Sequence, residues 1–515
     1  MASGADQPTM PESAHPQSAI CNPQSERASG VLLHPTSLPG PYGVGELGPA
    51  AVAFLDFLAA AGQRLWQVLP LGPTAEGDSP YTSPSAFAGN PLLVSVARLR
   101  DDGLLDRADL ADAPAFPTKV VAYEAVRPYK EGLLRRAHAR FRPDAAFRAF
   151  AAREGAWLDD YALFAALRAR HGGAHWWDWE PPLARRKPAA LARARRALAD
   201  ELGFQRFVQY RFCADYAALR RAARARGIRL IGDLPIFVAR DSADVWAHPD
   251  LFLLDADGAP TAVAGVPPDY YSATGQLWGN PLYRWDAMAR DGYAWWTARL
   301  RAALALYDLV RLDHFRGFEA YWAVPAGAET AANGRWVAGP RDDFFDAARA
   351  ALGGLPFIAE DLGLITPEVH ALRERVGLPG MKVLQFAFSD PDSPYLPHTF
   401  TPDCVVYTGT HDNDTTRGWW AAADDAERAF ARRYLGRDGA DIAWDLIRLA
   451  FGSVAALAVV PLQDVLDLGS AARMNTPGVP TGNWAWRCPP GALTPALAAR
   501  LRDLATVYGR APDVP

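Results

Sequence analysis

The sequence predicts an α/β protein, a closed (β/α)8 TIM barrel with inserted subdomains on its C-terminal face. Two observations predict this fold: short apolar runs end abruptly in polar residues, glycine or proline, and amphipathic stretches separate most of them. A buried strand that alternates with a helix eight times is typical of a closed parallel barrel. The expected strands are residues 30–34, 65–70, 228–235, 309–314, 357–361, 381–388, 405–412 and 457–464.

The stretches between these runs are rich in alanine and arginine and have the apolar spacing of helices. Residues 49–61 would follow the first strand, residues 205–226 would precede the third, and residues 295–306 would precede the fourth. Residues 342–352 and 367–376 would flank the fifth strand. Each helix supplies a crossover of the kind that neighbouring parallel strands need.

Two long separations predict insertions. Residues 71–227 separate the second and third strands, so we expect an inserted subdomain at about residues 78–203. Residues 239–291 are dense in Pro, Gly, Asp and aromatic residues, and we expect a lid or substrate-binding loop there, since long structured loops usually carry function. Residues 29–515 would form the catalytic barrel, and the Pro- and Ser-rich residues 1–28 a disordered tail.

The composition argues against several classes of function. The chain has 515 residues, 50% of them hydrophobic, and a net charge of −5, which gives no reason to expect a nucleic-acid partner. We expect no secretory signal and no membrane span, because the sequence lacks the apolar runs that both require. The four cysteines form no CxxC pair, so we expect no disulfide framework, no metal site and a cytoplasmic location. A monomer or weak homo-oligomer is expected.

Carboxylates close three of the expected strands. Asp313 ends the fourth strand, Glu360 the fifth and Asp412 the seventh. Reactive groups in a barrel lie at these C-terminal strand ends, and a carboxylate there must be paired, hydrogen-bonded or used in chemistry. A salt bridge with an arginine such as Arg316 or Arg417 would explain one carboxylate at a strand end, whereas three such carboxylates favour a catalytic site.

Three carboxylates around one mouth suit glycoside chemistry. One attacks the anomeric carbon, and a second donates a proton to the leaving oxygen and later acts as a base. A third can hold sugar hydroxyls and stabilise the charge of the transition state. The 17 Trp, 17 Tyr and 23 Phe residues add rings on which sugars can stack, and several lie in Gly- and Pro-rich loops.

The segments around these carboxylates resemble the three catalytic segments of the amylomaltases, which are 4-α-glucanotransferases (disproportionating enzymes) allied to the α-amylases. They read RLDHFRG at 311–317, AEDLG at 359–363 and GTHDND at 409–414. Further segments resemble the same family in the same order, from about Ser29 to about Arg487. These are HPTSLPG (34–40), GDSPY (77–81), GDLPIFV (232–238), GVPPDYY (265–271), GQLWGNPLY (275–283) and NTPG (475–478).

The resemblance implies roles for individual residues. Asp313 would be the nucleophile, Glu360 the acid/base and Asp412 the transition-state stabiliser. Arg311 would lie on the same strand face as Asp313, two residues away, and keep it ionised. The implied substrate-binding residues are Arg311, His314, His411, Asp233, Tyr81, Asp78, Tyr270, Tyr271, Gln276, Trp278 and Asn280.

The implied reaction is the transfer of α-1,4-glucan segments to the 4-hydroxyl of glucose or another glucan, by a retaining double displacement without cofactor or metal. The partners would be maltooligosaccharides, glucose, and glucans derived from starch or glycogen. Two alternatives stay open. An α-amylase-like hydrolase uses the same carboxylates with water as the acceptor, and a non-catalytic glucan-binding barrel would use none of them for turnover.

Overall fold

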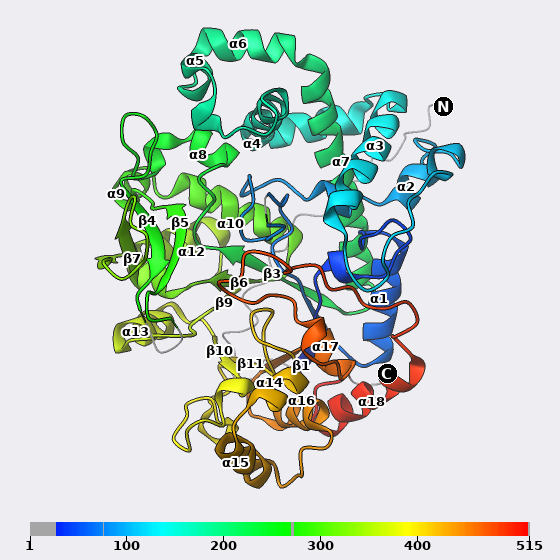
Figure 1. The fold of residues 1–515 in the computed structure, drawn as a ribbon, viewed down its shortest axis with the longest axis vertical. Helices are drawn as coiled ribbons and strands as arrows, with labels where there is room; N and C mark the ends of the chain where they lie inside the picture. The colour runs from blue at the N-terminus through cyan, green and yellow to red at the C-terminus, as the bar shows by residue number, and fades with distance from the viewer. Residues whose placement is uncertain (1–26, 76, 269–271, 513–515) are drawn as a thin grey trace, which may run out of the picture.

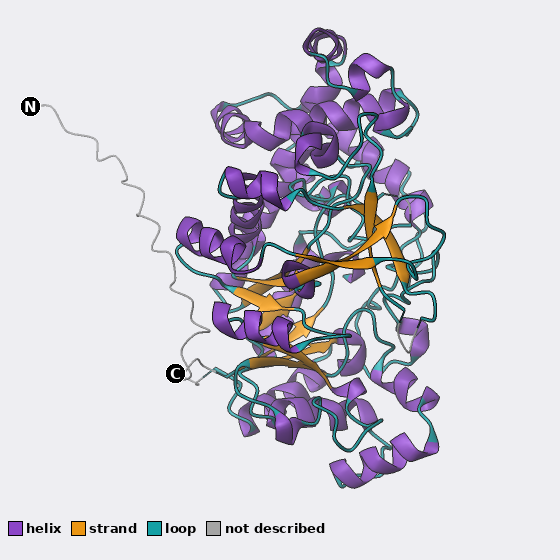
Figure 2. Ribbon diagram, turned by 90° about the vertical axis from the view of Figure 1, so that its left-hand side faces the viewer, coloured by secondary structure: helices purple, strands orange, loops and turns teal. Residues whose placement is uncertain are grey.

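The computed structural model describes residues 27–75, 77–268 and 272–512. Its centre is a parallel sheet of eight strands in the order β10-β11-β12-β1-β2-β3-β6-β9, surrounded by helices (Figures 1 and 2). The strands follow chain order around the ring, and β1 pairs with β12. They are β1 (Ala28–Leu32), β2 (Leu65–Gln67), β3 (Arg229–Pro235), β6 (Leu309–Asp313), β9 (Phe357–Ala359), β10 (Gly380–Val383), β11 (Cys404–Tyr407) and β12 (Leu457–Pro461).

Each of these strands overlaps one of the eight runs expected from the sequence, and the barrel prediction is confirmed. β1, β10 and β11 begin one or two residues earlier than expected. Several strands end earlier than expected. The run 381–388 turns into a 3-10 helix at Leu384–Phe386, and the run 457–464 turns into α17 (Leu462–Val465). Both extensions carry buried apolar side chains, so hydrophobicity alone did not mark where the strand stops.

The ring closes between β9 and β10 through single hydrogen bonds rather than a ladder. The Ala359 amide donates to the Pro379 carbonyl at 2.9 Å. The Asp361 carboxylate accepts from the Met381 amide at 2.7 Å and lies 3.3 Å from the Arg373 guanidinium. Asp361 therefore supports the barrel wall, although it directly follows Glu360 in the chain.

Helices cover the outside of the barrel (Figure 2). Their apolar faces join the strands in one large core, in which Trp296, Phe318 and Phe344 pack together. The covering helices are α1 (Pro49–Ala60), α7 (Ala199–Arg224), α10 (Ala294–Leu306), α12 (Arg341–Leu352), α13 (Pro367–Val376), α16 (Ile442–Gly452) and α18 (Pro495–Val507).

In the sequence, a group of helices follows β2 and precedes β3, and it lies at the top of Figure 1. It comprises α2 (Val96–Asp101), α3 (Tyr123–Arg140), α4 (Ala145–Arg170), α5 (Pro181–Ala184) and α6 (Pro188–Ala197). The expected subdomain boundary near residue 203 falls inside α7, which packs on α4 and also on β3. The division into a barrel and an inserted unit stays a prediction.

A second, antiparallel sheet has the order β5-β4-β7-β8 and stands beside the barrel mouth. Its strands are β4 (Ala262–Val266), β5 (Gln276–Pro281), β7 (Ala320–Pro325) and β8 (Arg335–Ala338). The first two belong to the expected lid region, and the last two follow β6 through the short α11 (Arg316–Glu319). The remaining helices are α8 (Ala243–Ala247), α9 (Trp285–Arg290), α14 (Thr416–Ala422) and α15 (Asp425–Leu435).

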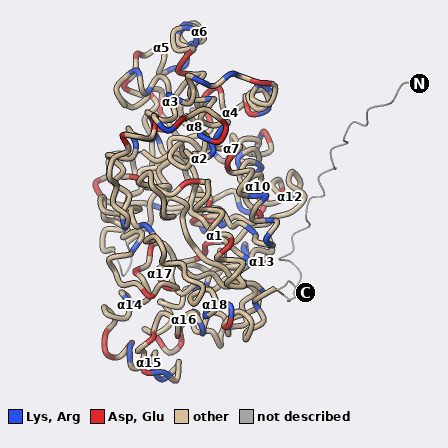
Figure 3. Tube along the Cα trace, turned by 90° about the vertical axis from the view of Figure 1, so that its right-hand side faces the viewer, with Lys and Arg blue, Asp and Glu red and all other residues tan. Residues whose placement is uncertain are grey.

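Lys and Arg alternate with Asp and Glu over the outer helices (Figure 3). None of the described helices is both long and apolar enough to cross a membrane. The expected tail, residues 1–28, lies almost wholly outside the described residues, and β1 begins at Ala28.

Candidate active site

Arg311 joins two carboxylates at the carboxyl ends of β3 and β6. Its Nη1 donates to both oxygens of Asp233 at 2.9 Å and to Asp313 Oδ1 at 2.8 Å. Asp233 and Arg311 are register partners, so their side chains enter the barrel on the same side. Burial alone would lower the pKa of Arg311, but Asp233 and Asp313 raise it well above its usual value. Arg311 thus stays charged beside Asp313.

Glu360 follows β9 and faces the same mouth. Its Oε2 accepts from the His314 amide at 2.7 Å, and its Oε1 accepts from the Leu362 amide at 3.0 Å. Burial raises the pKa of Glu360 to about 7, while Arg311 lowers it and the Asp313 charge adds to the rise. A carboxyl group with this pKa is present in both protonation states near neutral pH, as an acid/base catalyst requires.

His314 lies between β6 and the antiparallel β5-β4-β7-β8 sheet, which is called the lid sheet below because two of its strands belong to the expected lid region. Its backbone has a φ of +54°, in the left-handed region, and its ring meets the Trp278 ring edge-to-face at a centroid distance of 4.8 Å. Burial lowers the pKa of His314 to about 4, so its ring is neutral at pH 7. Its Nε2 is buried without a hydrogen-bond partner in the described structure.

Asp412 stands on the opposite side of the mouth, after β11. Its Oδ1 accepts from Asn475 Nδ2 at 2.6 Å and lies 3.4 Å from His411 Nε2. The His411 ring stacks on Tyr81 at a centroid distance of 5.1 Å, and the Tyr81 hydroxyl donates to Asp233 at 2.8 Å. These contacts connect Asp412 to the Asp233–Arg311–Asp313 group. The Asp412 side chain keeps 45% of its surface exposed and can reach a ligand.

The other expected binding residues lie in segments next to this centre. Asp78 forms an ion pair with Arg127, and Asn280 Nδ2 donates to the Val238 carbonyl at 2.9 Å. Gln276 Oε1 accepts from Trp278 Nε1 at 3.2 Å. Gln276 and Trp278 are exposed, whereas Asn280 holds β5 against the loop that follows β3. Tyr270 and Tyr271 lie outside the described residues.

Sequence reasoning did not assign a role to three further residues of this centre. Asn475 donates to Asp412 and belongs to the NTPG segment. The place of its amide side chain after the last expected strand could have suggested a role at the barrel mouth. The Trp484 ring lies 5.9 Å from that of His411, and no sequence pattern predicted this. His34 lines a small pocket with His411, and burial lowers its pKa to about 3.

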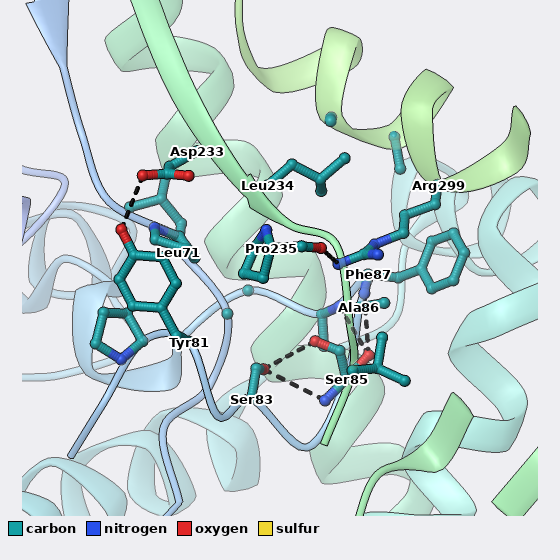
Figure 4. Close-up of a pocket in the computed structure, with 18 of the residues that line it drawn as sticks. Leu71, Tyr81, Ser83, Ser85, Ala86, Phe87, Asp233, Leu234, Pro235 and Arg299 are labelled. Carbon is teal, nitrogen blue, oxygen red and sulfur yellow. Dashed lines mark hydrogen bonds between the residues drawn. The ribbon is translucent and has the colours of Figure 1, made fainter. Parts of the chain in front are cut away.

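A larger pocket, of about 700 Å³ including its open side, lies next to the catalytic mouth (Figure 4). The Tyr81–Asp233 hydrogen bond lies at one end, and Arg299 at the other donates to the Pro235 carbonyl at 2.7 Å. Asp313, Glu360 and Asp412 do not line it. The pocket therefore shares Tyr81 and Asp233 with the carboxylate centre but does not include those three carboxylates.

The described residues hold no cluster of three or more His, Cys, Asp or Glu side chains that could bind a metal ion. The carboxyl groups of the site are Asp313, which accepts a hydrogen bond from Arg311, Glu360, whose pKa is near neutrality, and Asp412, which is half exposed. On a (β/α)8 barrel, this combination is typical of enzymes that act on glycosidic bonds.

Comparison with known proteins specifies the family. Residues 33–494 match the model of the 4-alpha-glucanotransferase family, and the chain belongs to that family. It is 55% identical to the 4-alpha-glucanotransferase of Thermus thermophilus over 499 residues, which cover 94% of this chain and 99% of that protein. It is 49% identical to that of Synechocystis over 498 residues, which cover 94% and 98% of the two chains.

A solved structure of similar shape is the amylomaltase from Streptococcus agalactiae in complex with acarbose. It superposes with a TM-score of 0.92 at 37% sequence identity, and the match covers 94% of this chain and all of that one. The family suggested by the sequence motifs is thereby confirmed.

Proposed function

We propose that this 4-α-glucanotransferase moves segments of α-1,4-glucan to the 4-hydroxyl of glucose or another glucan by a retaining double displacement at Asp313 and Glu360. Family membership supports the transfer reaction. The observation that carries the residue roles is the pairing of Asp313, which accepts a hydrogen bond from Arg311, with Glu360, whose pKa is raised to about 7. A cationic neighbour suits the nucleophile, and a raised pKa suits the acid.

In the first half-reaction, Asp313 attacks the anomeric carbon and forms a β-linked glycosyl ester. The bond to the leaving oxygen breaks, and Glu360 transfers its proton to that oxygen. His314 and Asp412 bind hydroxyls of the sugar whose bond is cleaved, and the Asp412 charge stabilises the positive character of the transition state. The Asn475 and His411 contacts hold the Asp412 carboxylate in place for this role.

In the second half-reaction, ionised Glu360 takes the proton from the 4-hydroxyl of an acceptor sugar. The hydroxyl oxygen attacks the glycosyl ester from the face opposite Asp313, which restores the α-linkage and releases the Asp313 carboxylate. No cofactor takes part in either step. The substrates in this proposal are maltooligosaccharides, glucose, and glucans from starch or glycogen.

Product analysis with maltotriose tests the proposal. Transfer produces glucose together with longer maltooligosaccharides, whereas a hydrolase of the α-amylase type produces only shorter sugars. Chain-length redistribution without a gain of reducing ends supports the proposed function. Formation of glucose and maltose alone would assign the protein to the hydrolases, and absence of any turnover would indicate a glucan-binding barrel.

The pH dependence follows from the raised pKa of Glu360. The acid form is needed for the first half-reaction, so kcat/KM for a maltooligosaccharide should fall as pH rises through about 7. Burial is the main cause of the raised pKa of Glu360, and the Asp313 charge adds to it. A pH–rate profile checks this. With an α-maltosyl fluoride donor, whose leaving group needs little proton donation, kcat/KM should no longer fall at high pH. An unchanged fall with this donor would contradict the assignment of Glu360 as the acid.

Trp278 is expected to favour sugar over water as the acceptor. The residue is 38% exposed and its ring contacts His314, so it offers a surface on which an acceptor glucose can stack while water is excluded. Trp278→Ala should lower chain-length redistribution more than it lowers hydrolysis of the same maltooligosaccharide. The neighbouring Leu277, 40% exposed, provides a control, because Leu277→Ala should leave the ratio unchanged. An equal loss of both reactions would limit Trp278 to loop packing.

A further inference from the structure

An exposed tryptophan lies on the outer strand of the lid sheet. Trp336 in β8 keeps 40% of its surface exposed, and Leu364, in the loop after β9, keeps 55%. The β7–β8 hairpin follows β6, and Leu364 follows β9. Segments that follow barrel strands lie on the C-terminal face, so both side chains share the face of the catalytic mouth.

Arg316 links the two exposed side chains. Its guanidinium carbon lies 3.8 Å from the centroid of the Trp336 ring, and its Nη1 donates to the Leu364 carbonyl. Arg316 is only 6% exposed, and its Nε has no hydrogen-bond partner in the described structure. No carboxylate of the described residues forms an ion pair with it, although Glu319 and Glu368 are near enough to influence its charge. Arg316 is thus a buried cation that has no carboxylate counter-ion among the described residues, and the Trp336 ring and the Leu364 carbonyl are its neighbours instead.

The positions of Arg316 and Leu364 relative to Asp313 and Glu360 indicate which part of the bound glucan they face. Arg316 lies three residues beyond Asp313, and Leu364 lies four residues beyond Glu360. Glu360 protonates the leaving oxygen, so the leaving fragment, and later the acceptor, must lie on the Glu360 side of the cleaved bond. Tyr81 and His411, by contrast, pack around Asp233 and Asp412 on the other side.

We propose that Trp336, Arg316 and the Leu364 loop form an acceptor subsite for a glucose unit of an α-1,4-glucan beyond the unit at the cleaved bond. The inference rests on the proposed transfer reaction. The exposed surface of the Trp336 ring accepts the apolar C–H face of a pyranose, and the Arg316 guanidinium below holds the ring in orientation.

The subsite is tested by the length dependence of acceptor binding. α-Maltotriosyl fluoride serves as the donor, because fluoride leaves the acceptor side empty, and glucose or maltotetraose serves as the acceptor. Trp336→Ala should raise the acceptor KM for maltotetraose roughly tenfold and leave that for glucose within about twofold. Trp336→Tyr, which keeps an aromatic surface, should restore most of the affinity for maltotetraose.

A matched control is available in the inserted helices. An arginine also stacks on the Trp177 ring: the guanidinium carbon of Arg240 lies 3.8 Å from the ring centroid. Trp177→Ala should change neither acceptor KM. An unchanged KM for maltotetraose in Trp336→Ala, or an equal rise for both acceptors, would overturn the subsite while the wild-type enzyme still transfers. Failure of the wild-type enzyme to transfer to either acceptor would instead refute the proposed function.

Discussion

Replacing Asp313 by alanine should reduce glucan transfer by on the order of 10⁴-fold or more, because the covalent intermediate then has no atom on which to form. The fold should survive. Asp313 ends β6 at the barrel mouth, and its hydrogen-bond partner in the described structure is Arg311. The measurement is the rate of maltotriose redistribution, together with a thermal unfolding curve that shows the variant is folded.

Azide distinguishes loss of the nucleophile from loss of another group. In Asp313→Ala, azide can enter the space of the missing carboxylate and attack an α-maltosyl fluoride from the opposite face, which produces a β-glycosyl azide. Asp346→Ala is a matched control, because this aspartate lies on α12 with 72% of its side chain exposed and should be dispensable. Transfer at more than about a hundredth of the wild-type rate in folded Asp313→Ala would remove Asp313 from its role.

Replacing Glu360 by alanine should lower transfer from maltooligosaccharides by roughly 10³-fold, which is within the range for a positioned general acid. The loss should depend on the leaving group. Formation of the glycosyl ester from α-maltosyl fluoride should persist, since fluoride departs without a proton. Attack on the ester should be slow, because the base for the acceptor hydroxyl is missing.

Azide should restore turnover of the fluoride donor by Glu360→Ala, and its product should have the anomeric configuration opposite to that from Asp313→Ala. It needs no base and attacks the β-linked ester from the face opposite Asp313, so the product should be an α-glycosyl azide. Glu374→Ala on α13, with 69% of its side chain exposed, is the control. Equal loss with maltooligosaccharide and fluoride donors, or a β-glycosyl azide product, would show that Glu360 does not act as the acid/base.

The eight barrel strands were predictable because parallel strands buried on both faces must be apolar throughout, and such runs are visible in the chain. The strand ends were less predictable. Leu384 and Leu462 continue apolar runs but begin a 3-10 turn and a helix, because these segments also pack into the core. The small lid sheet was not predicted. Its strands are short and carry exposed residues such as Trp336, and their pairing joins segments distant in sequence.

The sequence by itself determined which residues are available for chemistry: Asp313, Glu360 and Asp412 close apolar runs within motifs that identify the family. Only the tertiary structure decided how those residues behave. The pKa of Glu360 rises because the fold buries it near Asp313, and Arg311 reaches Asp233 on another strand. The fold also brings Arg316 against the Trp336 ring. Burial and the distances between residues remote in the chain determine these pKa values and contacts, and a short stretch of sequence specifies neither.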